Sequence, residues 1–283
     1  MAVKPVIYGQ SERPPRGDYA RARDDYTCDQ DFAAYTTEDH DTWRKLYARQ
    51  SAMLPGLAAQ TFIELLPQLD AAQGSPRFED INARLLPATG WQLVGVPGLI
   101  PEEPFFTMLA NKKFPVTDWI RTPQEMDYVV EPDVFHDLFG HVPLLFDVTY
   151  ANYIQAYGNA ALKAHALERS RSDCANAVEH LARLYWYTIE FGLLREHGGV
   201  KAYGAGILSS TGELEHSVKS QQSKRLPLSN ASELLGCMGS SYKIDSYQSQ
   251  YFVIDSFSAL LDLTAPDFTP HYQQLAVERS NIK

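Results

Sequence analysis

The chain has 283 residues, a net charge of −10 at pH 7 with histidine counted as neutral, and 45% hydrophobic and 12% aromatic residues. This length is enough for one sizeable hydrophobic core, or two at most. The acidic balance disfavours nucleic acids and anionic membranes as partners.

The N-terminal third is predicted to begin with a tail and continue as helices. Residues 1–31 are rich in Arg, Asp and Pro with little periodicity, which predicts a poorly ordered tail ahead of a single domain at 32–283. A TTED string starting at Thr36 offers capping oxygens, and apolar residues then follow at helical spacing. In chain order we expect a helix from Thr36 to Leu54, helices over Phe62–Leu69 and Ile81–Leu86, and a strand over Trp91–Val96.

The remainder of the chain mixes helices with short strands. We expect a loop over Val96–Phe106, an amphipathic helix over 147–165, a polar stretch over Leu167–Asn176, and a buried helix over Leu181–Leu194. These are followed by a strand over Val200–Ser210, a surface loop over Lys219–Asn230, two short strands within 242–254, and helices near 256–263 and 270–279.

Cysteine usage and the lack of long apolar runs indicate a reducing compartment. Cys28, Cys174 and Cys237 are odd in number and have no CxxC spacing, so no disulfide framework is expected. The N-terminus has no apolar signal region, and nowhere do 18 apolar residues follow one another. We therefore expect a cytoplasmic protein.

The segment Glu131–Pro143, EPDVFHDLFGHVP, carries two histidines five residues apart. On an ideal α-helix such positions diverge by roughly 140°, so His136 and His141 can face one ion only if the helix loosens. Gly140 and Pro143 permit a bend, and we expect the helix to end at the second histidine. Imidazole is a common metal ligand, so the pair makes half of a metal site. Burial against a backbone carbonyl is the ordinary alternative.

A third candidate ligand is Glu190, within the apolar string LARLYWYTIEFGLL at Leu181–Leu194. A helix that is apolar all round is normally buried, and a buried carboxylate is costly unless it meets a cation or several donors. A salt bridge to Arg183 or to a distant arginine would serve as well as a metal. Two imidazoles and one carboxylate suit non-haem Fe(II), but the same set also occurs in zinc hydrolases, so the residues alone leave both metals open.

Four strings in order resemble the pterin-dependent aromatic amino acid hydroxylases, most of all the bacterial phenylalanine 4-hydroxylases. They are EPDVFHDLFGHVPLL, LARLYWYTIEFGLL, YGAGILSS at Tyr203–Ser210 and YFVIDSF at Tyr251–Phe257. The resemblance covers roughly residues 35–270. It implies a mostly helical α+β basket with short strands, with His136, His141 and Glu190 holding Fe(II). It also implies tetrahydropterin, either tetrahydrobiopterin or a bacterial pterin, as the two-electron donor for hydroxylation by dioxygen.

By resemblance, the pterin is held by Gly98, Leu99, Ile100, Phe105, Asp137 and Tyr185. The first three offer backbone groups to the pterin edge, and Phe105 stacks on its ring, a contact worth on the order of 1 kcal/mol beyond burial. Composition alone favours a plain turn between strand and helix at this loop. Asp137 stands where many relatives have Glu, and its contact with the pterin runs through water.

The resemblance also implies a substrate pocket, lined by Pro132, Trp186, Phe191, Gly206 and Ser209. Arg121 binds the substrate carboxylate, and Asp133 holds the guanidinium, as a fork of donors matched to a carboxylate allows. Where tryptophan is the substrate, the position of Trp186 is usually Phe. Trp186 therefore predicts phenylalanine as the substrate and tyrosine as the product.

Other functions remain open at this point. They are a tryptophan hydroxylase of the same family, a zinc hydrolase with the same ligands, and a helical binding protein without a metal. No heptad run follows Asp267, unlike the tetramerising helix of animal relatives, so we expect a monomer without their regulatory domain. The other histidines are expected to be structural or solvated: His40, His165, His180, His197, His216 and His271.

Overall fold

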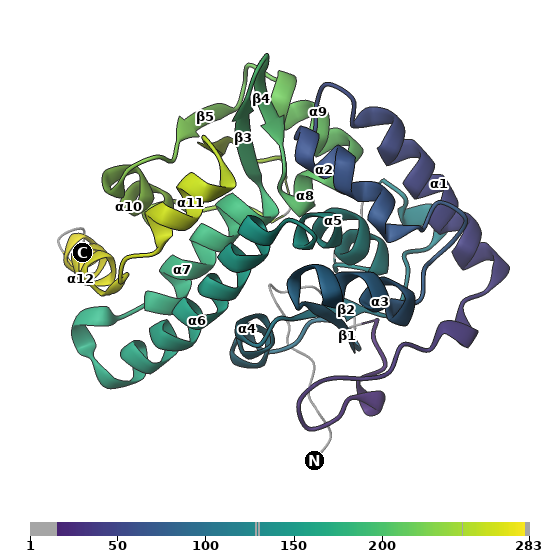
Figure 1. Cartoon of the computed structure of the whole chain (residues 1–283). Helices are drawn as coiled ribbons and strands as arrows, with labels where there is room; N and C mark the ends of the chain where they lie inside the picture. Colours follow the sequence, from purple (N-terminus) through teal and green to yellow (C-terminus); the bar gives the residue numbers. More distant parts are fainter. Residues whose placement is uncertain (1–15, 128, 130, 245, 281–283) are drawn as a thin grey trace.

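The computed structural model describes residues 16–127, 129, 131–244 and 246–280 (Figure 1). The α-helices are α1 (Thr37–Met53), α2 (Gln60–Leu65), α3 (Phe78–Thr89), α4 (Glu102–Ala110), α5 (Val142–Leu145), α6 (Val148–Ser170), α7 (Ala177–Tyr185), α8 (Ala205–Leu208), α9 (Thr211–Lys219), α10 (Ala231–Gly239), α11 (Phe257–Thr264) and α12 (Thr269–Ser280). The strands are β1 (Gln92–Val96), β2 (Lys113–Thr117), β3 (Gly192–Glu196), β4 (Gly199–Ala202), β5 (Lys224–Pro227) and β6 (Gln250–Ile254). The predicted mostly helical α+β class is confirmed.

Single turns of other helix types complete the chain. The 3₁₀ turns are η1 (Tyr19–Arg21), η2 (Phe32–Ala34), η3 (Leu66–Leu69), η4 (Pro123–Glu125) and η6 (Ser172–Cys174). Two π-helical segments, η5 (His136–His141) and η7 (Trp186–Glu190), coincide with the predicted metal ligands. Among the described residues, the π-helical segments therefore lie where the chemistry is expected.

Helix α1 begins where its capping residues predict. The Thr36 hydroxyl accepts a hydrogen bond from the Asp39 backbone N–H at 3.2 Å, and the Asp39 carboxylate accepts one from the Thr36 backbone N–H at 2.8 Å. This reciprocal arrangement satisfies two donors that a helix start otherwise leaves free. The apolar face of α1 places Trp43 and Leu46 in the core, both fully buried. The expected helix and its start are confirmed.

Helix α6 is the central support of the half of the molecule that contains α7 and α11. Figure 1 shows α6 and α7 running side by side. Buried hydroxyl groups join them: Tyr157 Oη donates to the Leu181 carbonyl oxygen at 2.8 Å, and Tyr153 shares a 2.8 Å hydrogen bond with Thr188. Because the tyrosine rings are fully buried, these bonds remove the cost of leaving the hydroxyls without partners. Helix α7 is thereby held in one position relative to α6.

Two small sheets flank the helices. In the first, β1 and β2 pair in parallel from Gln92–Lys113 to Val96–Thr117. The second has the order β4-β3-β6-β5, with β3 antiparallel to β4 and the other neighbours parallel. Figure 1 shows α5 lying between the two sheets.

The predicted helix over 181–194 is wrong at its C-terminal end. Helical structure stops at Glu190, and Gly192 begins β3. A Cβ on Gly192 would lie 2.2 Å from the Thr188 carbonyl oxygen and 2.3 Å from the Tyr203 ring, so only glycine fits at this turn. Leu193 and Leu194 are therefore buried in a strand. A short apolar run is compatible with either structure.

Four other predicted elements differ from the structure. The expected strand over 200–210 ends at Ala202, and α8 follows it; a Cβ on Gly204 would lie 2.4 Å from the Glu190 carbonyl oxygen. The expected surface loop over 219–230 contains β5, and among the described residues of 242–254 only β6 is a strand. Phe105 and Phe106 lie on α4 and not in a loop.

Residues 16–31 pack against the rest of the chain. The Arg21 guanidinium lies 2.7 Å from the Asp118 carboxylate, and the Cys28 backbone N–H donates to the Gly95 carbonyl oxygen at 2.8 Å. Tyr19 Oη donates to the Leu99 carbonyl oxygen at 3.0 Å. We expected residues 1–31 to be a poorly ordered tail; residues 1–15 lie outside the described residues, and the domain boundary stays a prediction.

The three cysteines are free and buried. This agrees with the predicted absence of a disulfide framework. Within the described ranges, no helix is both long and apolar enough to cross a membrane.

Candidate active site

The histidine segment is a π-helix. In η5, hydrogen bonds run from i to i+5, so residues five apart come onto the same side of the helix. This is the loosening that the spacing of His136 and His141 requires. The expectation that the helix ends at His141 is wrong, because α5 continues from Val142. Pro143 is tolerated there because it lies in the first turn of α5, where its missing N–H has no partner to lose.

Gly140 lets a neighbouring helix approach the ligands closely. A Cβ added to Gly140 would lie 2.9 Å from both the Cβ and the carbonyl oxygen of Ala205, at the start of α8. Real side chains do not pack at such distances, so alanine at this position would push η5 and α8 apart. Helix α8 also leads to Ser209, which contacts the first ligand.

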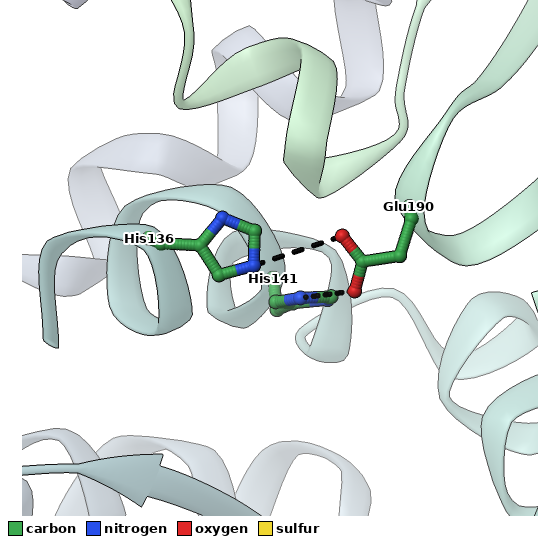
Figure 2. A group of neighbouring side chains, drawn as sticks. All are labelled: His136, His141 and Glu190. Carbon is green, nitrogen blue, oxygen red and sulfur yellow. Dashed lines mark ion pairs between the residues drawn. The ribbon is translucent and has the colours of Figure 1, made fainter. Parts of the chain in front are cut away.

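Glu190 is the last residue of η7, which continues α7 without a break. Its two carboxylate oxygens face the two imidazoles, as Figure 2 shows. Glu190 Oε1 lies 3.1 Å from His141 Nε2, and Glu190 Oε2 lies 3.6 Å from His136 Nε2. The two rings are nearly perpendicular, with centroids 5.1 Å apart. All three side chains therefore converge on one point from two segments of the chain.

Ser209 selects the tautomer of His136. The Ser209 hydroxyl donates its single hydrogen to the Ala205 carbonyl oxygen at 2.8 Å. At 2.9 Å from His136 Nδ1, the same oxygen must therefore accept a hydrogen bond from Nδ1–H. The lone pair of His136 is then on Nε2, which points toward Glu190. A second partner of this kind fixes the orientation and the basicity of a metal-binding imidazole.

The electrostatics of the site favour metal-binding protonation states. Burial lowers the pKa of His136 to about 4, so its imidazole is neutral at neutral pH. Burial also acts to raise the pKa of Glu190, but the facing imidazoles, His141 foremost, hold that pKa at about 2. A neutral imidazole and an ionised carboxylate are the forms that bind metal ions.

The donor set fits an iron ion. His136, His141 and Glu190 have ligand atoms within 4.8 Å of one another, and no other such cluster of three exists among the described residues. Two imidazoles and one carboxylate on one side of an ion leave positions open for reactants. The alternative salt bridge is not formed, since Arg183 bonds to Glu179 and to the Gly239 carbonyl oxygen.

The three ligands lie in the wall of a cavity of about 790 Å³. Of the predicted pterin and substrate residues, this cavity is lined by Gly98, Leu99, Ile100, Phe105, Asp137, Tyr185, Arg121, Pro132, Trp186, Phe191, Gly206 and Ser209. The structure thus brings together residues from most of the chain around the ligands. Which of them contact pterin and which contact substrate stays a prediction.

Asp133 is the predicted site residue that does not line the cavity, because it lies beneath Arg121. Its carboxylate accepts hydrogen bonds from Arg121 Nε at 2.8 Å, Nη2 at 2.7 Å and the backbone N–H at 2.9 Å. Both side chains are buried. Burial acts to raise the pKa of Asp133, but the guanidinium outweighs it and lowers the pKa. The Nη1 group of Arg121 makes no hydrogen bond to any described residue, so it remains for a ligand.

Aromatic and polar groups on the predicted pterin side are also in place. The Phe105 ring lies edge-on to Tyr185, with centroids 5.8 Å apart. The Asp137 carboxylate accepts from the Thr117 backbone N–H at 2.7 Å, and burial raises the pKa of Asp137 to about 7. A Cβ on Gly98 would lie 2.8 Å from Tyr19 Oη, so glycine lets residues 16–21 cover this loop. A flat apolar ligand with a polar edge fits these surroundings.

Sequence reasoning missed one wall of the cavity. It consists of Glu213 together with Tyr242, Ile244, Ser246, Tyr247 and Gln248. The stretch 240–248 is polar and has no periodicity, so nothing in its pattern marks it. The one available signal was the indole of Trp186 in an apolar segment, whose N–H needs an acceptor where it is shielded from water, but the sequence does not say which residue provides it.

Comparisons with known proteins agree with this geometry. Residues 10–269 match a family model described as biopterin-dependent aromatic amino acid hydroxylase. Phenylalanine-4-hydroxylase of Chromobacterium violaceum is 49% identical over 253 residues, which cover 89% of this chain and 81% of that protein. The enzyme of the same name from Ralstonia nicotianae is 48% identical over 254 residues, covering 89% and 77%. The iron- and phenylalanine-bound crystal structure of the Chromobacterium violaceum enzyme matches with a TM-score of 0.82 at 48% identity, covering 89% of this chain and 88% of that one.

Proposed function

The chain belongs to the biopterin-dependent aromatic amino acid hydroxylases, and on that premise we propose that it is a phenylalanine 4-monooxygenase. It converts L-phenylalanine to L-tyrosine with dioxygen, Fe(II) and a tetrahydropterin. The observation that carries this proposal is the convergence of His136, His141 and Glu190 in the wall of a cavity that also contains Arg121. The relative crystallised with iron and phenylalanine supports the same metal and substrate for this chain.

Different residues of the chain have different roles in this reaction. When bound, iron and tetrahydropterin supply the activation of dioxygen. Ser209 keeps His136 in the tautomer that binds the metal, and Asp133 holds Arg121 so that its free edge binds the substrate carboxylate. The apolar walls keep water away from the reacting ring, which suppresses side reactions. No nucleophile or general base from the protein is required.

Phenylalanine is favoured over other aromatic amino acids by the pocket wall. The Trp186 ring stacks with the Tyr242 ring at a centroid distance of 4.2 Å, and it packs against the tilted Phe191 ring at 4.5 Å. An indole in this position leaves room for one benzene ring but not for a second indole. The hydroxyl of tyrosine would enter an apolar slot without a partner, at a cost of about 1 kcal/mol or more.

Replacing Trp186 with Phe is expected to improve tryptophan as a substrate. The smaller ring opens space, so kcat/KM for tryptophan relative to phenylalanine should rise about tenfold, as expected for one change of pocket shape. Chromatography of products formed with both amino acids in competition measures this ratio. If the unmodified enzyme makes hydroxytryptophan faster than tyrosine, the pocket argument is wrong, although the metal and pterin assignments survive.

Oxygen consumption distinguishes the proposed function from its alternatives. The hydroxylase should hold about one iron per chain, as three ligands around one site require, and should consume dioxygen only when pterin and phenylalanine are both present. A zinc hydrolase needs neither dioxygen nor pterin, and a binding protein holds no stoichiometric metal. An oxygen-electrode trace with and without pterin, combined with metal analysis, decides among the three.

We also propose that the chain acts as a cytoplasmic monomer, with residues 32–283 as its catalytic domain. All three cysteines are free, which suits a reducing compartment. Of the large apolar side chains exposed among the described residues, Leu86, Val148 and Val277 lie on separate helices, and Tyr242, Ile244 and Tyr247 are confined to one loop. An obligate interface typically needs a broader apolar patch. Light scattering after gel filtration tests the monomer.

A further inference from the structure

The Trp186 indole is held by its edge as well as by its faces. Its Nε1–H donates to Gln248 Oε1 at 3.1 Å. The Tyr242 ring stacks on the indole, and the Phe191 ring packs against it at an interplanar angle of 30°. These contacts restrict how far the indole moves along its normal, but they allow rotation within the ring plane. The hydrogen bond to Gln248 removes that remaining freedom. The orientation of the pocket wall therefore depends on an amide from a different part of the chain.

Both polar groups of the Gln248 side chain are hydrogen-bonded. Its Nε2 group donates to the Lys243 carbonyl oxygen at 2.7 Å and to the Ser246 carbonyl oxygen at 3.2 Å, while Oε1 faces the indole. Because the nitrogen faces two acceptors and the oxygen faces a donor, only one orientation of the amide fits. Gln248 is 5% exposed, although described neighbours such as Lys243 and Tyr247 are exposed. Gln248 is therefore a buried residue at the end of an otherwise exposed loop.

The Gln248 backbone is held by side chains of α9. Its N–H donates to Glu213 Oε1 at 3.1 Å, and its carbonyl oxygen lies 3.3 Å from His216 Nε2. The Tyr251 hydroxyl also donates to Glu213 Oε1, at 2.5 Å. Glu213 and His216 belong to α9 and Tyr251 to β6, so two elements hold the residue in place. Gln248 thus connects α9 and β6 to both Trp186 and the loop.

We propose that Gln248 is a positioning residue, which fixes the Trp186 indole and the loop residues Lys243 and Ser246 in one arrangement and thereby restricts the pocket to a single benzene ring. This inference rests on the proposed function and extends it to a residue that does not itself contact the reacting atoms. Gln248 acts on substrate selection by fixing the orientation of the Trp186 indole in the pocket. Its loss lets the indole turn, which weakens the fit of phenylalanine and gives tryptophan room.

Replacing Gln248 with Met tests the proposal, because Met has a similar length and neither accepts nor donates strongly. The ratio of kcat/KM for phenylalanine to that for tryptophan should fall about fivefold, the factor that one hydrogen bond is worth. The KM for phenylalanine should rise, while the KM for pterin stays within about twofold, because Gln248 acts only on the amino acid pocket. The carbonyl groups of Lys243 and Ser246 lie on exposed residues and can bond water, so folding should survive. If Gln248→Met does not fold, Gln248→Asn, whose amide is too short to reach the indole, is expected to give the same shift.

A double-mutant cycle with Trp186→Phe separates positioning from general loosening. Phe has no indole N–H, so in that background Gln248→Met should change the selectivity ratio by less than about twofold. The matched control is Gln250→Met, which removes an amide bonded to Tyr187 Oη at 3.3 Å outside the cavity and should leave the ratio unchanged. An equal change in both backgrounds, an equal rise in both KM values, or the same shift in the control would overturn the inference.

The two proposals fail in different ways. An unmodified enzyme that forms no tyrosine from phenylalanine refutes the proposed function, whatever Gln248 does. An enzyme that forms tyrosine and keeps its selectivity in Gln248→Met refutes only the positioning role.

Discussion

Alanine in place of Glu190 is expected to remove bound iron and to lower kcat by more than about a hundredfold, since even the partners of metal ligands cost 10–100-fold when lost. The Glu190 carboxylate supplies both oxygens that face His136 Nε2 and His141 Nε2. Without this carboxylate only two imidazoles remain, and a site with three protein ligands has no redundant ligand. Alanine at either histidine is expected to have the same result. Iron analysis and steady-state oxygen consumption measure the two effects.

The loss should be one of metal binding and not of folding. Helix α7 and η7 are held by α6 through buried tyrosines, so the fold does not depend on the carboxylate. Circular dichroism should therefore show native helix content in Glu190→Ala. His197→Ala, which changes an exposed histidine in the β3–β4 turn, is the matched control and should retain iron and activity. Full activity in any of the three ligand variants would exclude that residue from the triad.

Lysine in place of Arg121 is expected to raise the KM for phenylalanine about ten- to a hundredfold, the range for losing hydrogen bonds to a charged group. Arg121 binds Asp133 through Nε and Nη2 and still presents Nη1 to the cavity. A lysine ammonium is a single point charge, so it cannot hold Asp133 in two places and also bind a carboxylate as a fork. The KM for pterin should barely change. Initial rates with each substrate varied in turn give both constants.

Lysine is preferred to alanine here because Asp133 is fully buried. Removing the positive charge would leave a buried carboxylate without a partner, at a cost of about 3–5 kcal/mol in stability. Arg195→Lys is the matched control: its side chain is more than half exposed and pairs with Asp255 on the surface. Equal effects of Arg121→Lys on the KM for amino acid and for pterin would show that Arg121 does not bind the substrate.

Sequence patterns predicted elements well where one physical signal dominated. The capped start of α1 and the apolar spacing of Trp43 and Leu46 needed no knowledge of the rest of the chain. The end of the Glu190 helix could not be predicted, because Leu193 and Leu194 are equally suited to a buried helix and a buried strand. The contact of Gly192 with Tyr203 decides between helix and strand, and it is a tertiary contact.

The same difference between local sequence signals and tertiary contacts applies at the candidate site. The ligands could be predicted because two histidines and a buried carboxylate carry their chemistry in their residue types. Gln248 could not, because an amide in a polar, aperiodic stretch resembles any surface residue. Only the fold brings it to Trp186. Ser209 was predicted as a substrate residue, and the structure additionally gives it the hydrogen bond to His136.

The two π-helices also limit how the length of the chain can change. A π-helical turn closes its hydrogen bond one residue later than an α-helical turn does, so each ligand segment is a single deletion away from a regular helix. One residue inserted between His136 and His141 would place the two histidines six apart, roughly 120° from each other around a regular helix, so they could no longer face one ion. One residue deleted there would leave them four apart on the same face of a regular α-helix. The β3–β4 turn, where Gly198 and Gly199 are surrounded by open space, can absorb such a change. Insertions should therefore be tolerated less well between His136 and His141 than in this turn.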